Sequence, residues 1–366
     1  MLYSKTLLHF KIMKKIKTSL LAVAAVGLSV MFPSKTDACT RVVFIGDSAQ
    51  VITGRTLDWK SNIPTNLYVY PRGIEKSGYV DGQLKWTSKY GSVVAVGYDM
   101  GVSEGLNEKG LVVNLLYLPN SVYQLPDGDT RVKLSTALWA SFVLDNFATT
   151  KEAVEYLKQD LIQIVAPSMP DGSSTTLHMA ISDNTGYSAI IEYIDGKLQL
   201  NEGYDCDVLT NAPPYEEQVA INSYWESVGG MNMLPGTNRS TDRFARASFY
   251  IKAVPKNSSH AMALAGVFGV IDNCSVPVGI EVPGKPEMSS TRWRSCADQR
   301  DLVYYFKPTI DPSVMWVDLH DYNLNPGSPI MKLDMMNGQV YGGNVKKDMQ
   351  KSKGFTPVME LSDLSK

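Results

Sequence analysis

The sequence contains little histidine and none of the short motifs that usually hold a metal. Four histidines occur in 366 residues, and the three after residue 38 are widely separated: His178, His260 and His320. No CxxC or HExxH motif is present. Because protein metal sites usually show such clustered ligands, we expect neither a metal nor another cofactor.

The chain also lacks an excess of positive charge and, after its N-terminal segment, a long apolar run. The formal net charge is −2 and the sequence pI is about 6.1, which argues against a nucleic-acid partner. No segment after residue 38 has the roughly 18 uninterrupted apolar residues of a membrane span. No repeat or Pro/Ser linker interrupts residues 39–366. We therefore expect one soluble domain over residues 39–366, without stable membrane association.

Residues 1–38 have the pattern of a signal peptide. An apolar segment, residues 19–32, is preceded by five lysines: Lys5, Lys11, Lys14, Lys15 and Lys17. It is short for a membrane span and typical in length for an export signal. Met13 is an alternative start that would give a more compact leader. We expect export to the periplasm or the medium, with signal peptidase as the maturation partner.

The predicted cleavage point lies immediately before Cys39. Thr36 and Ala38 occupy the −3 and −1 positions, where signal peptidase favours small residues. A lipoprotein signal would also place a cysteine first, but Asp37 at −2 and the lack of leucine at −3 fit that signal poorly. An uncleaved anchor would be longer and more apolar. Ordinary cleavage would leave Cys39 as the first residue of the exported chain.

The order of the predicted elements favours large, mostly antiparallel sheets covered by helices. Strands come first, beginning with a hairpin formed by residues 40–45 and 50–54, and strands return in the middle and at the end of the chain. Thr149 and Glu152 have the spacing of a capping box. Two helical blocks separate the groups of strands, with apolar residues at helical spacing over 132–146, 149–161, 240–254 and 259–273. We predict an α+β fold, a four-layer αββα sandwich.

An N-terminal cysteine would carry two useful groups on one residue. Its thiol has an ordinary pKa of about 8.5 and its α-amine one of about 7.7–8.0, so the amine can take the thiol proton near neutral pH. This is nucleophile-and-base chemistry that needs no histidine. The alternative is a small buried cysteine that merely lies near the cut.

Arg55 and Asp58 are predicted to lie beside Cys39. If residues 40–45 and 50–54 form a hairpin, the end of the second strand returns to the start of the first. Arg55 would then stabilise the thiolate, because a nearby cation lowers a thiol pKa, and Asp58 would hold the ammonium or the thiol proton. The alternative is a surface ion pair at a hairpin end, which contributes little stability.

Six segments together resemble the choloylglycine hydrolase family of N-terminal-nucleophile hydrolases. They are CTRVVF, GRTLDW, GLNEKGLVVNLLYLPN, DVLTNAPPYEEQ, STDRFARASF and TRW, and they cover nearly all of residues 39–366 in order. That family contains penicillin V acylases and conjugated bile salt hydrolases. The resemblance implies hydrolysis of a linear, non-peptide C–N amide bond in a small molecule.

The resemblance also implies a role for each matching residue. Cys39 matches the nucleophile and its α-amine the base, and Arg55 and Asp58 match the pair beside it. Asn211 matches the asparagine that helps to bind the tetrahedral oxyanion, where amide donors are needed. Arg243 matches a second active-site arginine. Without that match, Arg243 would be a solvated residue near a helix N-terminus, where a cation is slightly unfavourable.

Four aromatic residues are predicted near the substrate. Tyr117 aligns with the second oxyanion-hole position, where its backbone N–H is the expected donor. Penicillin V acylases tend to carry tyrosine there and bile salt hydrolases asparagine, so this mark favours the acylase branch. Trp59, Tyr68 and Tyr70 are candidates for the wall of an apolar acyl pocket, although buried aromatic residues more often form core.

Two rival functions are weighed against this interpretation. The segment GVSEG, residues 101–105, matches the GxSxG motif with Ser103 as nucleophile, but the motif requires a following helix, and NEKG instead predicts a hairpin turn. A periplasmic small-molecule binder with the same fold is the second rival. The favoured substrates are penicillin V and related aryloxyacetyl or long-chain acyl amides, including acyl-homoserine lactones, with conjugated bile salts as the alternative.

Two further expectations concern assembly and cysteine pairing. The resemblance implies a homo-oligomer, a tetramer in many members of the family. Export would permit a disulfide. With Cys39 as a free thiol, at most one pair can form among Cys206, Cys274 and Cys296, and pairing of Cys274 with Cys296 is left open.

Overall fold

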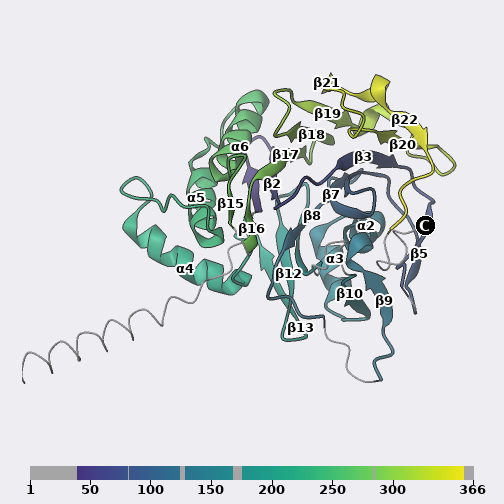
Figure 1. Cartoon of the computed structure of the whole chain (residues 1–366), viewed down its shortest axis with the longest axis horizontal. Helices are drawn as coiled ribbons and strands as arrows, with labels where there is room; N and C mark the ends of the chain where they lie inside the picture. Colours follow the sequence, from purple (N-terminus) through teal and green to yellow (C-terminus); the bar gives the residue numbers. More distant parts are fainter. Residues whose placement is uncertain (1–38, 81, 124–127, 168–174, 283–284, 358–366) are drawn as a thin grey trace, which may run out of the picture. The chain divides into compact units, whose positions relative to one another are not determined.

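Two large β-sheets form the centre of the structure (Figure 1). The computed structural model describes residues 39–80, 82–123, 128–167, 175–282 and 285–357. The seven-stranded sheet has the order β14 (Val208–Leu209), β1 (Thr40–Ile45), β2 (Val51–Asp58), β17 (Thr291–Asp298), β18 (Val303–Pro308), β19 (Met315–Asp318) and β21 (Gly343–Asn344). The nine-stranded sheet has the order β13 (Lys197–Gly203), β12 (Ser188–Ile194), β11 (Leu177–Ser182), β8 (Val112–Tyr117), β7 (Gly101–Asn107), β6 (Ser92–Gly97), β3 (Thr65–Tyr70), β20 (Ile330–Leu333) and β22 (Gln350–Ser352).

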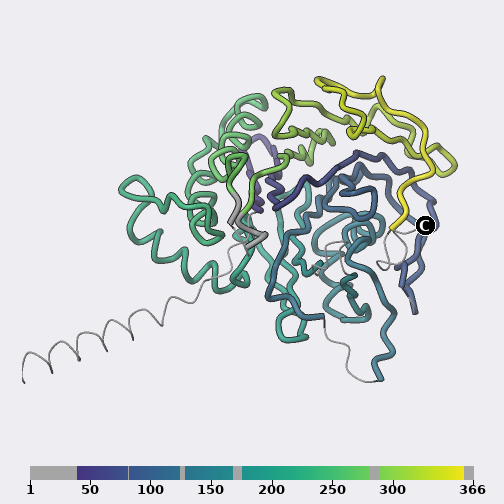
Figure 2. The backbone as a smooth tube through the Cα atoms, viewed as in Figure 1, coloured from purple at the N-terminus to yellow at the C-terminus, as the bar shows by residue number. Residues whose placement is uncertain are grey.

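Pairing in both large sheets is antiparallel, except between β19 and β21. Strands far apart in the sequence lie side by side. β2, near the start of the described chain, pairs along its whole length with β17, and Figure 2 shows these purple and green segments running together. Three two-stranded ribbons complete the strands: β4 (Glu75–Ser77) with β5 (Lys85–Thr87), β9 (Val132–Ser135) with β10 (Ile162–Val165), and β15 (Glu281–Val282) with β16 (Lys285–Ser289).

Helices cover the outer face of each sheet. The helices α2 (Thr136–Asn146) and α3 (Thr150–Leu157) pack on the nine-stranded sheet, and α5 (Ser240–Ala253) and α6 (His260–Cys274) pack on the seven-stranded sheet, with α4 (Tyr215–Val228) against α5. Two short 3₁₀ turns span Leu319–Asp321 and Lys346–Asp348. None of the helices in the described ranges is long and apolar enough to cross a membrane.

Three clusters of buried side chains fill the spaces between these four layers. Trp139 of α2 belongs to the cluster under the nine-stranded sheet. Leu67 and Phe306, one from each sheet, belong to the cluster between the sheets. Val42 and Ile271 belong to the cluster between the seven-stranded sheet and its helices. The α+β prediction, with helices on both outer faces of two mostly antiparallel sheets, is therefore confirmed.

One glycine explains how closely α6 approaches the sheet. Gly54 in β2 faces α6, and a Cβ there would lie 2.6 Å from Val267 Cγ1 and 3.1 Å from Ile271 Cγ2. A larger residue would push α6 away from the strand that carries Arg55. The helix therefore packs against β2 where glycine leaves room.

Local signals placed most helices, with two errors. Thr149 caps α3 by accepting the Glu152 N–H, and the Glu152 carboxylate accepts the N–H of Ala148, one residue earlier than in the usual capping box. The prediction of helix over 132–146 is wrong at its start, because residues 132–135 form β9 and pair with β10. We did not predict α4, although prolines before it and two glutamates in its first turn are a known start signal.

Candidate active site

Cys39 lies immediately before β1, a strand that is paired on both edges. β1 pairs with β2 and with β14, and the register places Thr40 opposite Thr56. The Thr40 N–H donates to Thr56 Oγ1 over 3.0 Å. The Cys39 side chain is buried, with 4% of its surface exposed. The predicted hairpin is confirmed, and its second strand extends to Asp58.

Arg55 reaches the thiol from β2. Its Nη2 lies 3.9 Å from Cys39 Sγ and donates to Leu115 O over 2.8 Å. Its Nη1 forms an ion pair of 2.7 Å with Glu104 Oε2, and both side chains are almost fully buried. Burial lowers the pKa of Arg55, but the Glu104 carboxylate and the thiol outweigh that effect and raise it above its ordinary value. Arg55 is therefore a permanent cation beside the thiol.

Glu104 joins the two sheets beneath Arg55. Besides Arg55, its carboxylate accepts hydrogen bonds from Asn114 Nδ2 at 3.0 Å, Tyr304 OH at 2.5 Å and Ser295 Oγ. A buried carboxylate is tolerated only when its lone pairs are occupied in this way. The donors come from β2, β8, β18 and β17, so the Glu104 side chain fixes Arg55 relative to both sheets.

Asp58 ends β2 on the other side of the thiol. Its backbone oxygen lies 3.9 Å from Cys39 Sγ, and its Oδ2 accepts from Thr56 Oγ1 at 3.3 Å. Its Oδ1 is buried and has no hydrogen-bond partner within the described residues. Burial raises the pKa of Asp58 to about 7, against the lowering effects of the Arg243 charge and of hydrogen bonds from Thr291 and Thr56.

Asn211 and Arg243 approach Cys39 from outside the hairpin. Asn211 Oδ1 accepts from the Cys39 nitrogen at 2.5 Å and from Arg243 Nη2 at 3.0 Å. Arg243 Nη1 also donates to Cys39 O and, over 2.7 Å, to Thr40 Oγ1. Arg243 is fully buried in the first turns of α5. Arg243 is therefore not a solvated helix residue, which was the alternative to an active-site role, and it binds the backbone of Cys39.

The orientation of the Asn211 amide follows from these donors. Because Oδ1 faces two N–H groups, Nδ2 must be the atom that faces Tyr117, and it donates to Tyr117 O over 2.7 Å. Tyr117 ends β8, and its ring packs edge-on against Trp59 with the centroids 5.5 Å apart. The structure thus places Asn211, Tyr117 and Cys39 together.

The charges around the thiol oppose each other. Burial, the largest effect, raises the pKa of the Cys39 thiol, and the Asp58 carboxylate raises it further. The charges of Arg55 and Arg243 lower this pKa, but the net result is a thiol pKa above its ordinary value. In the full-length chain the Cys39 nitrogen is a peptide nitrogen with no base function. The thiol therefore stays largely protonated at neutral pH in this form.

An apolar cavity of about 160 Å³ opens at Cys39. Cys39, Arg55 and Asp58 lie among its lining residues together with Trp59 and Tyr117. The remaining walls are mainly apolar and are formed by Leu57, Ile63, Gly97, Tyr98, Met100, Gly101, Val102, Ser103, Leu115, Thr136, Ala137, Pro167, Thr175 and Leu177. The cavity can accept an apolar group whose reacting carbon lies near the thiol.

Tyr68 and Tyr70 do not line this cavity. Both are buried on the helix-covered face of β3, where Tyr68 OH donates to Asp99 Oδ1 over 3.0 Å and the two rings stack. Alternate residues of a strand point to opposite faces, and Leu67 and Val69 take the face toward the other sheet. Trp59 is the one of the three predicted wall residues that lines the cavity.

The GxSxG motif lies on a strand and not on a nucleophile elbow. Residues 101–107 form β7, which turns at Asn107–Gly110 into β8 without a helix. Ser103 lines the cavity, and its neighbour Glu104 holds Arg55. The four cysteines are all free and buried, so Cys274 and Cys296 are not paired.

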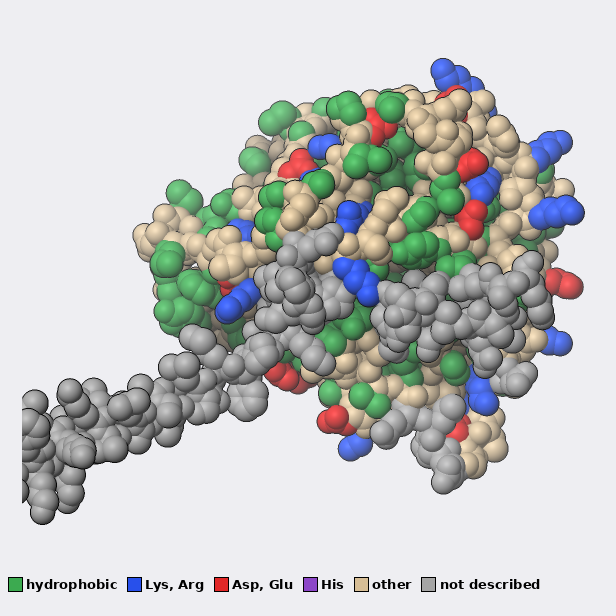
Figure 3. All heavy atoms as spheres, in the orientation of Figure 1, with side chains coloured by type: hydrophobic (Ala, Val, Ile, Leu, Met, Phe, Trp, Pro, Cys, Tyr) green, Lys and Arg blue, Asp and Glu red, His purple; other side chains and the backbone are tan. Residues whose placement is uncertain are grey.

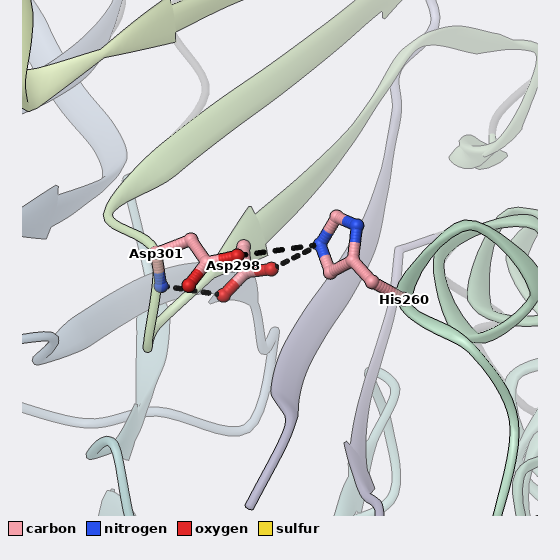
Figure 4. Close-up of side chains that lie close together, drawn as sticks. All are labelled: His260, Asp298 and Asp301. Carbon is pink, nitrogen blue, oxygen red and sulfur yellow. Dashed lines mark hydrogen bonds and ion pairs between the residues drawn. The ribbon is translucent and has the colours of Figure 1, made fainter. Parts of the chain in front are cut away.

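A separate cluster of titratable groups lies outside the cavity (Figure 4). His260 Nε2 lies 2.5 Å from Asp298 Oδ2 and 3.9 Å from Asp301 Oδ2, and Asp298 Oδ1 accepts the Asp301 N–H at 2.9 Å. These contacts connect the first residue of α6 to the turn after β17. We assign the cluster a structural role in joining the helix to the sheet.

The model of the choloylglycine hydrolase family of linear amide C–N hydrolases matches residues 39–332. The chain belongs to this family. A penicillin V acylase of Pectobacterium atrosepticum is 39% identical over 93% of this chain and 97% of its own length. A bile salt hydrolase/transferase of Clostridium perfringens is 26% identical over 78% of this chain and 94% of its own length. The chain is accordingly a linear amide C–N hydrolase of the penicillin V acylase and bile salt hydrolase type.

Solved structures agree with the fold. The penicillin V acylase from Agrobacterium tumefaciens superposes with a TM-score of 0.82 at 45% identity, covering 87% of this chain and 99% of that one. A conjugated bile acid hydrolase from Clostridium perfringens superposes with a TM-score of 0.71 at 22% identity, covering 84% and 98%. The second likeness concerns the fold alone.

Sequence reasoning missed Glu104 and the threonines beside Cys39. Glu104 occurs in an ordinary strand sequence, and its partners Asn114, Ser295 and Tyr304 come from three other strands. The unusual feature was a glutamate in a strand otherwise suited to burial. Only knowledge of how the two sheets stack would have identified Glu104 of β7 as the partner of Arg55 on β2.

Proposed function

We propose that Cys39 is the nucleophile of an exported hydrolase that cleaves penicillin V and related acyl amides, and that cleavage after residue 38 creates its base. The observation that carries the proposal is the gathering of the Cys39 thiol and nitrogen, Arg55, Asp58 and Asn211 at one end of an apolar cavity. The α-amine takes the thiol proton, and Sγ attacks the carbonyl carbon. The C–N bond then breaks as the ammonium returns the proton to the leaving amine. Water hydrolyses the thioester, which releases the acid and restores the thiol.

The tetrahedral intermediate needs hydrogen-bond donors beside the thiol. Asn211 Nδ2 uses one hydrogen for Tyr117 O, and its second hydrogen is the proposed oxyanion donor. The backbone N–H of Tyr117 is the proposed second donor. The fixed orientation of the Asn211 amide supports this assignment, because a flipped amide would present oxygen to the oxyanion.

Removal of residues 1–38 is the proposed activation step. The new α-ammonium of Cys39 would lie beside Asn211, which is also bound by Arg243. It would also lie near Asp58, whose buried Oδ1 has no hydrogen-bond partner within the described residues. The raised pKa of the Cys39 thiol in the full-length chain supports a latent precursor. We place the activated enzyme in the periplasm or medium, with signal peptidase as its processing partner.

Penicillin V is the first proposed substrate, on the strength of two similarities. Both penicillin V acylases named above are more than a third identical to this chain. Tyr117 aligns with a position where, by the family resemblance, penicillin V acylases tend to carry tyrosine. The apolar wall with Trp59 suits a phenoxyacetyl or alkyl acyl group. Conjugated bile salts are the second candidate, because a bile salt hydrolase/transferase is also similar over most of the chain.

The test combines the N-terminus with activity. Protein exported by a bacterial host is examined by intact mass and N-terminal sequencing, then assayed with penicillin V, an acyl-homoserine lactone and glycocholate. We expect a chain that starts at Cys39 and hydrolyses penicillin V fastest, and a Cys39→Ala variant with no activity but the same thermal unfolding. An active chain that retains residues before Cys39 contradicts the mechanism. Binding without turnover by the wild type would favour the non-catalytic binder.

Self-association is a further part of the proposal. Hydrophobic side chains gather over α4 and the segment after it (Figure 3), and the exposed ones include Val219, Ile221, Tyr224, Met231 and Met233. Exposed apolar side chains in such numbers favour a protein interface. We propose that this surface contributes to a homo-oligomer, a tetramer by the family resemblance. Light scattering should show a larger mass for the wild type than for Tyr224→Glu, and a monomeric wild type would contradict the proposal.

A further inference from the structure

The turn between β6 and β7 holds two consecutive non-glycine residues in left-handed backbone. Tyr98 has φ 54° and Asp99 has φ 53°. The Met100 N–H donates to Gly97 O over 2.9 Å, so Tyr98 and Asp99 are the two central residues of a β-turn between the paired residues Gly97 and Gly101. A turn with both central residues at positive φ usually holds asparagine, aspartate or glycine, so the bulky Tyr98 is the unusual residue here. Such strain persists only where the surroundings impose it, and it is frequent at functional sites.

The Asp99 side chain imposes this conformation. Its Oδ1 accepts from Asn66 Nδ2 at 2.8 Å and from Tyr68 OH at 3.0 Å, and its Oδ2 pairs with Lys332 Nζ at 2.6 Å. The three donors come from β3 and β20, which are neighbours in the nine-stranded sheet. The tip of the turn is therefore anchored to two strands outside its own hairpin.

Tyr98 connects the same turn to the opposite wall of the cavity. Its N–H donates to Pro64 O over 2.7 Å, and its hydroxyl donates to Asn62 O over 3.2 Å and lies 3.3 Å from Ser61 Oγ. These acceptors belong to the segment between β2 and β3. That segment supplies Trp59 and Ile63 to the cavity, and Tyr98 is itself a lining residue.

The two walls are also in close contact at Gly97. A Cβ on Gly97 would lie 3.1 Å from Ile63 Cγ2, which is tighter than an ordinary contact. The distance between the turn and the segment 59–64 is thus fixed by direct packing and by the Tyr98 hydrogen bonds. The width of the cavity at this point depends on the conformation of residues 97–99.

We propose that Tyr98 is a specificity-determining residue for the acyl group, and that Asp99 is a positioning residue that holds Tyr98 in the cavity wall. The inference rests on the proposed function, because it assigns the cavity to the acyl part of the amide. Tyr98 selects for a flat aromatic or extended alkyl acyl group over a short one. Asp99 does not contact the substrate and acts through the left-handed turn.

The experiment uses p-nitroanilides that differ only in their acyl group, acetyl, hexanoyl and phenoxyacetyl. For Tyr98→Ala and Asp99→Ala we expect KM for the phenoxyacetyl and hexanoyl amides to rise about tenfold, equivalent to about 1.4 kcal/mol, with kcat within about twofold and the acetyl amide unchanged. Asp99→Asn tolerates left-handed backbone and keeps an acceptor, so it should recover most of the wild-type KM. Equal changes for all three acyl groups, or none, would overturn the proposal.

A matched control separates specificity from stability. Asp195 also has left-handed backbone, with φ 51°, in the exposed turn between β12 and β13 outside the cavity. Asp195→Ala introduces the same strain and should leave every KM unchanged. If Asp195→Ala reproduces the effect of Asp99→Ala, the turn acts through stability and the positioning role is wrong.

A binding measurement separates this inference from the proposed function. Calorimetry measures phenoxyacetate binding to Cys39→Ala protein with and without Tyr98→Ala. Weaker binding in the double variant supports the role of Tyr98, even if the wild type hydrolyses none of the amides and the proposed function fails. Absence of phenoxyacetate binding, or equal binding by both proteins, overturns the inference while leaving hydrolysis to be judged on its own assay.

Discussion

Glu104 Oε2 lies 2.7 Å from Arg55 Nη1, and the two side chains form an ion pair that is buried between the sheets. Arg55 Nη2 faces the Cys39 thiol. The pair therefore couples the stability of the sheet interface to the charge beside the proposed nucleophile. Loss of either partner would leave the other charged and buried.

Glu104→Gln is expected to reduce both stability and activity. Removal of one partner of a buried ion pair costs roughly 3–5 kcal/mol, and Arg55 would lose the contact that orients it toward the thiol. Urea unfolding and kcat/KM for the amide substrates measure the two effects. Glu108→Gln is the matched control, because Glu108 pairs with Arg72 at the surface, where 42% of the arginine side chain is exposed. That change should cost below about 1 kcal/mol and leave kcat intact; equal losses in the two variants would contradict the role of Glu104.

Arg243→Lys should lower kcat while the protein remains folded. Arg243 uses its two Nη atoms for Cys39 O, Thr40 Oγ1 and Asn211 Oδ1, and the single ammonium of lysine cannot match this geometry. Misplacement of Asn211 by about 1 Å would reduce turnover by about 10²-fold. Arg246→Lys, one helical turn later, is the control. Its guanidinium binds Pro235 O and Thr237 O, so its loss should change unfolding but not kcat.

Asp58 gives the full-length chain a pH-dependent stability with a defined sign. Burial raises its folded pKa to about 7, above the unfolded value, so the folded chain binds more protons between about pH 4 and pH 7. The stabilisation that this extra bound proton gives the folded chain is fully present below about pH 4 and is lost as the pH rises through about 7. The unfolding free energy of the wild type should therefore fall relative to Asp58→Asn by up to roughly 4 kcal/mol across this range.

Urea denaturation of both proteins from pH 4 to pH 8 measures this difference. Asp195→Asn, in an exposed turn, provides the baseline for replacing an aspartate. A stability difference between wild type and Asp58→Asn that grows with pH in favour of the wild type would show that the sign is wrong. In the chain that begins at Cys39, the new ammonium should favour the carboxylate and reduce the slope.

Ser103→Ala should retain most of the activity. Ser103 lines the cavity but lies in the middle of β7 without the turn and helix that expose a serine nucleophile. Its hydroxyl has no assigned role in the proposed mechanism. Assays of Ser103→Ala and Cys39→Ala on the same substrate distinguish the two candidates, and an inactive serine variant beside an active cysteine variant would reverse our assignment.

Much of the fold was predictable because local and long-range signals agree. The hairpin of β1 and β2 was predicted from two apolar strands around a short turn, and it delivers Arg55 and Asp58 to Cys39 as expected. The contacts of Asn211 and Arg243 could be expected only through the family resemblance. No local sequence signal connects Asn211 to Cys39, which lies 172 positions earlier in the chain.

The errors have physical causes that the sequence does not display. Tyr68 and Tyr70 were only candidates for the cavity wall, and the structure buries both in a core cluster, because no residue of β3 lines the cavity. Residues 132–135 have helical spacing yet form β9, because pairing with β10 overrides local preference. Glu104 was missed because its partners are brought together only by the pairing of distant strands.

The residues that hold the thiol and some of the residues that line the cavity lie on different elements, and this separation affects how the range of substrates can change. Arg55 and Asp58 lie on β2, and Glu104, which holds Arg55, lies on β7, whereas Trp59, Ile63 and Tyr98 lie on connections that line the cavity. Random variation limited to residues 59–64 and 97–101 would alter which amides fit while leaving the chemistry of Cys39 in place.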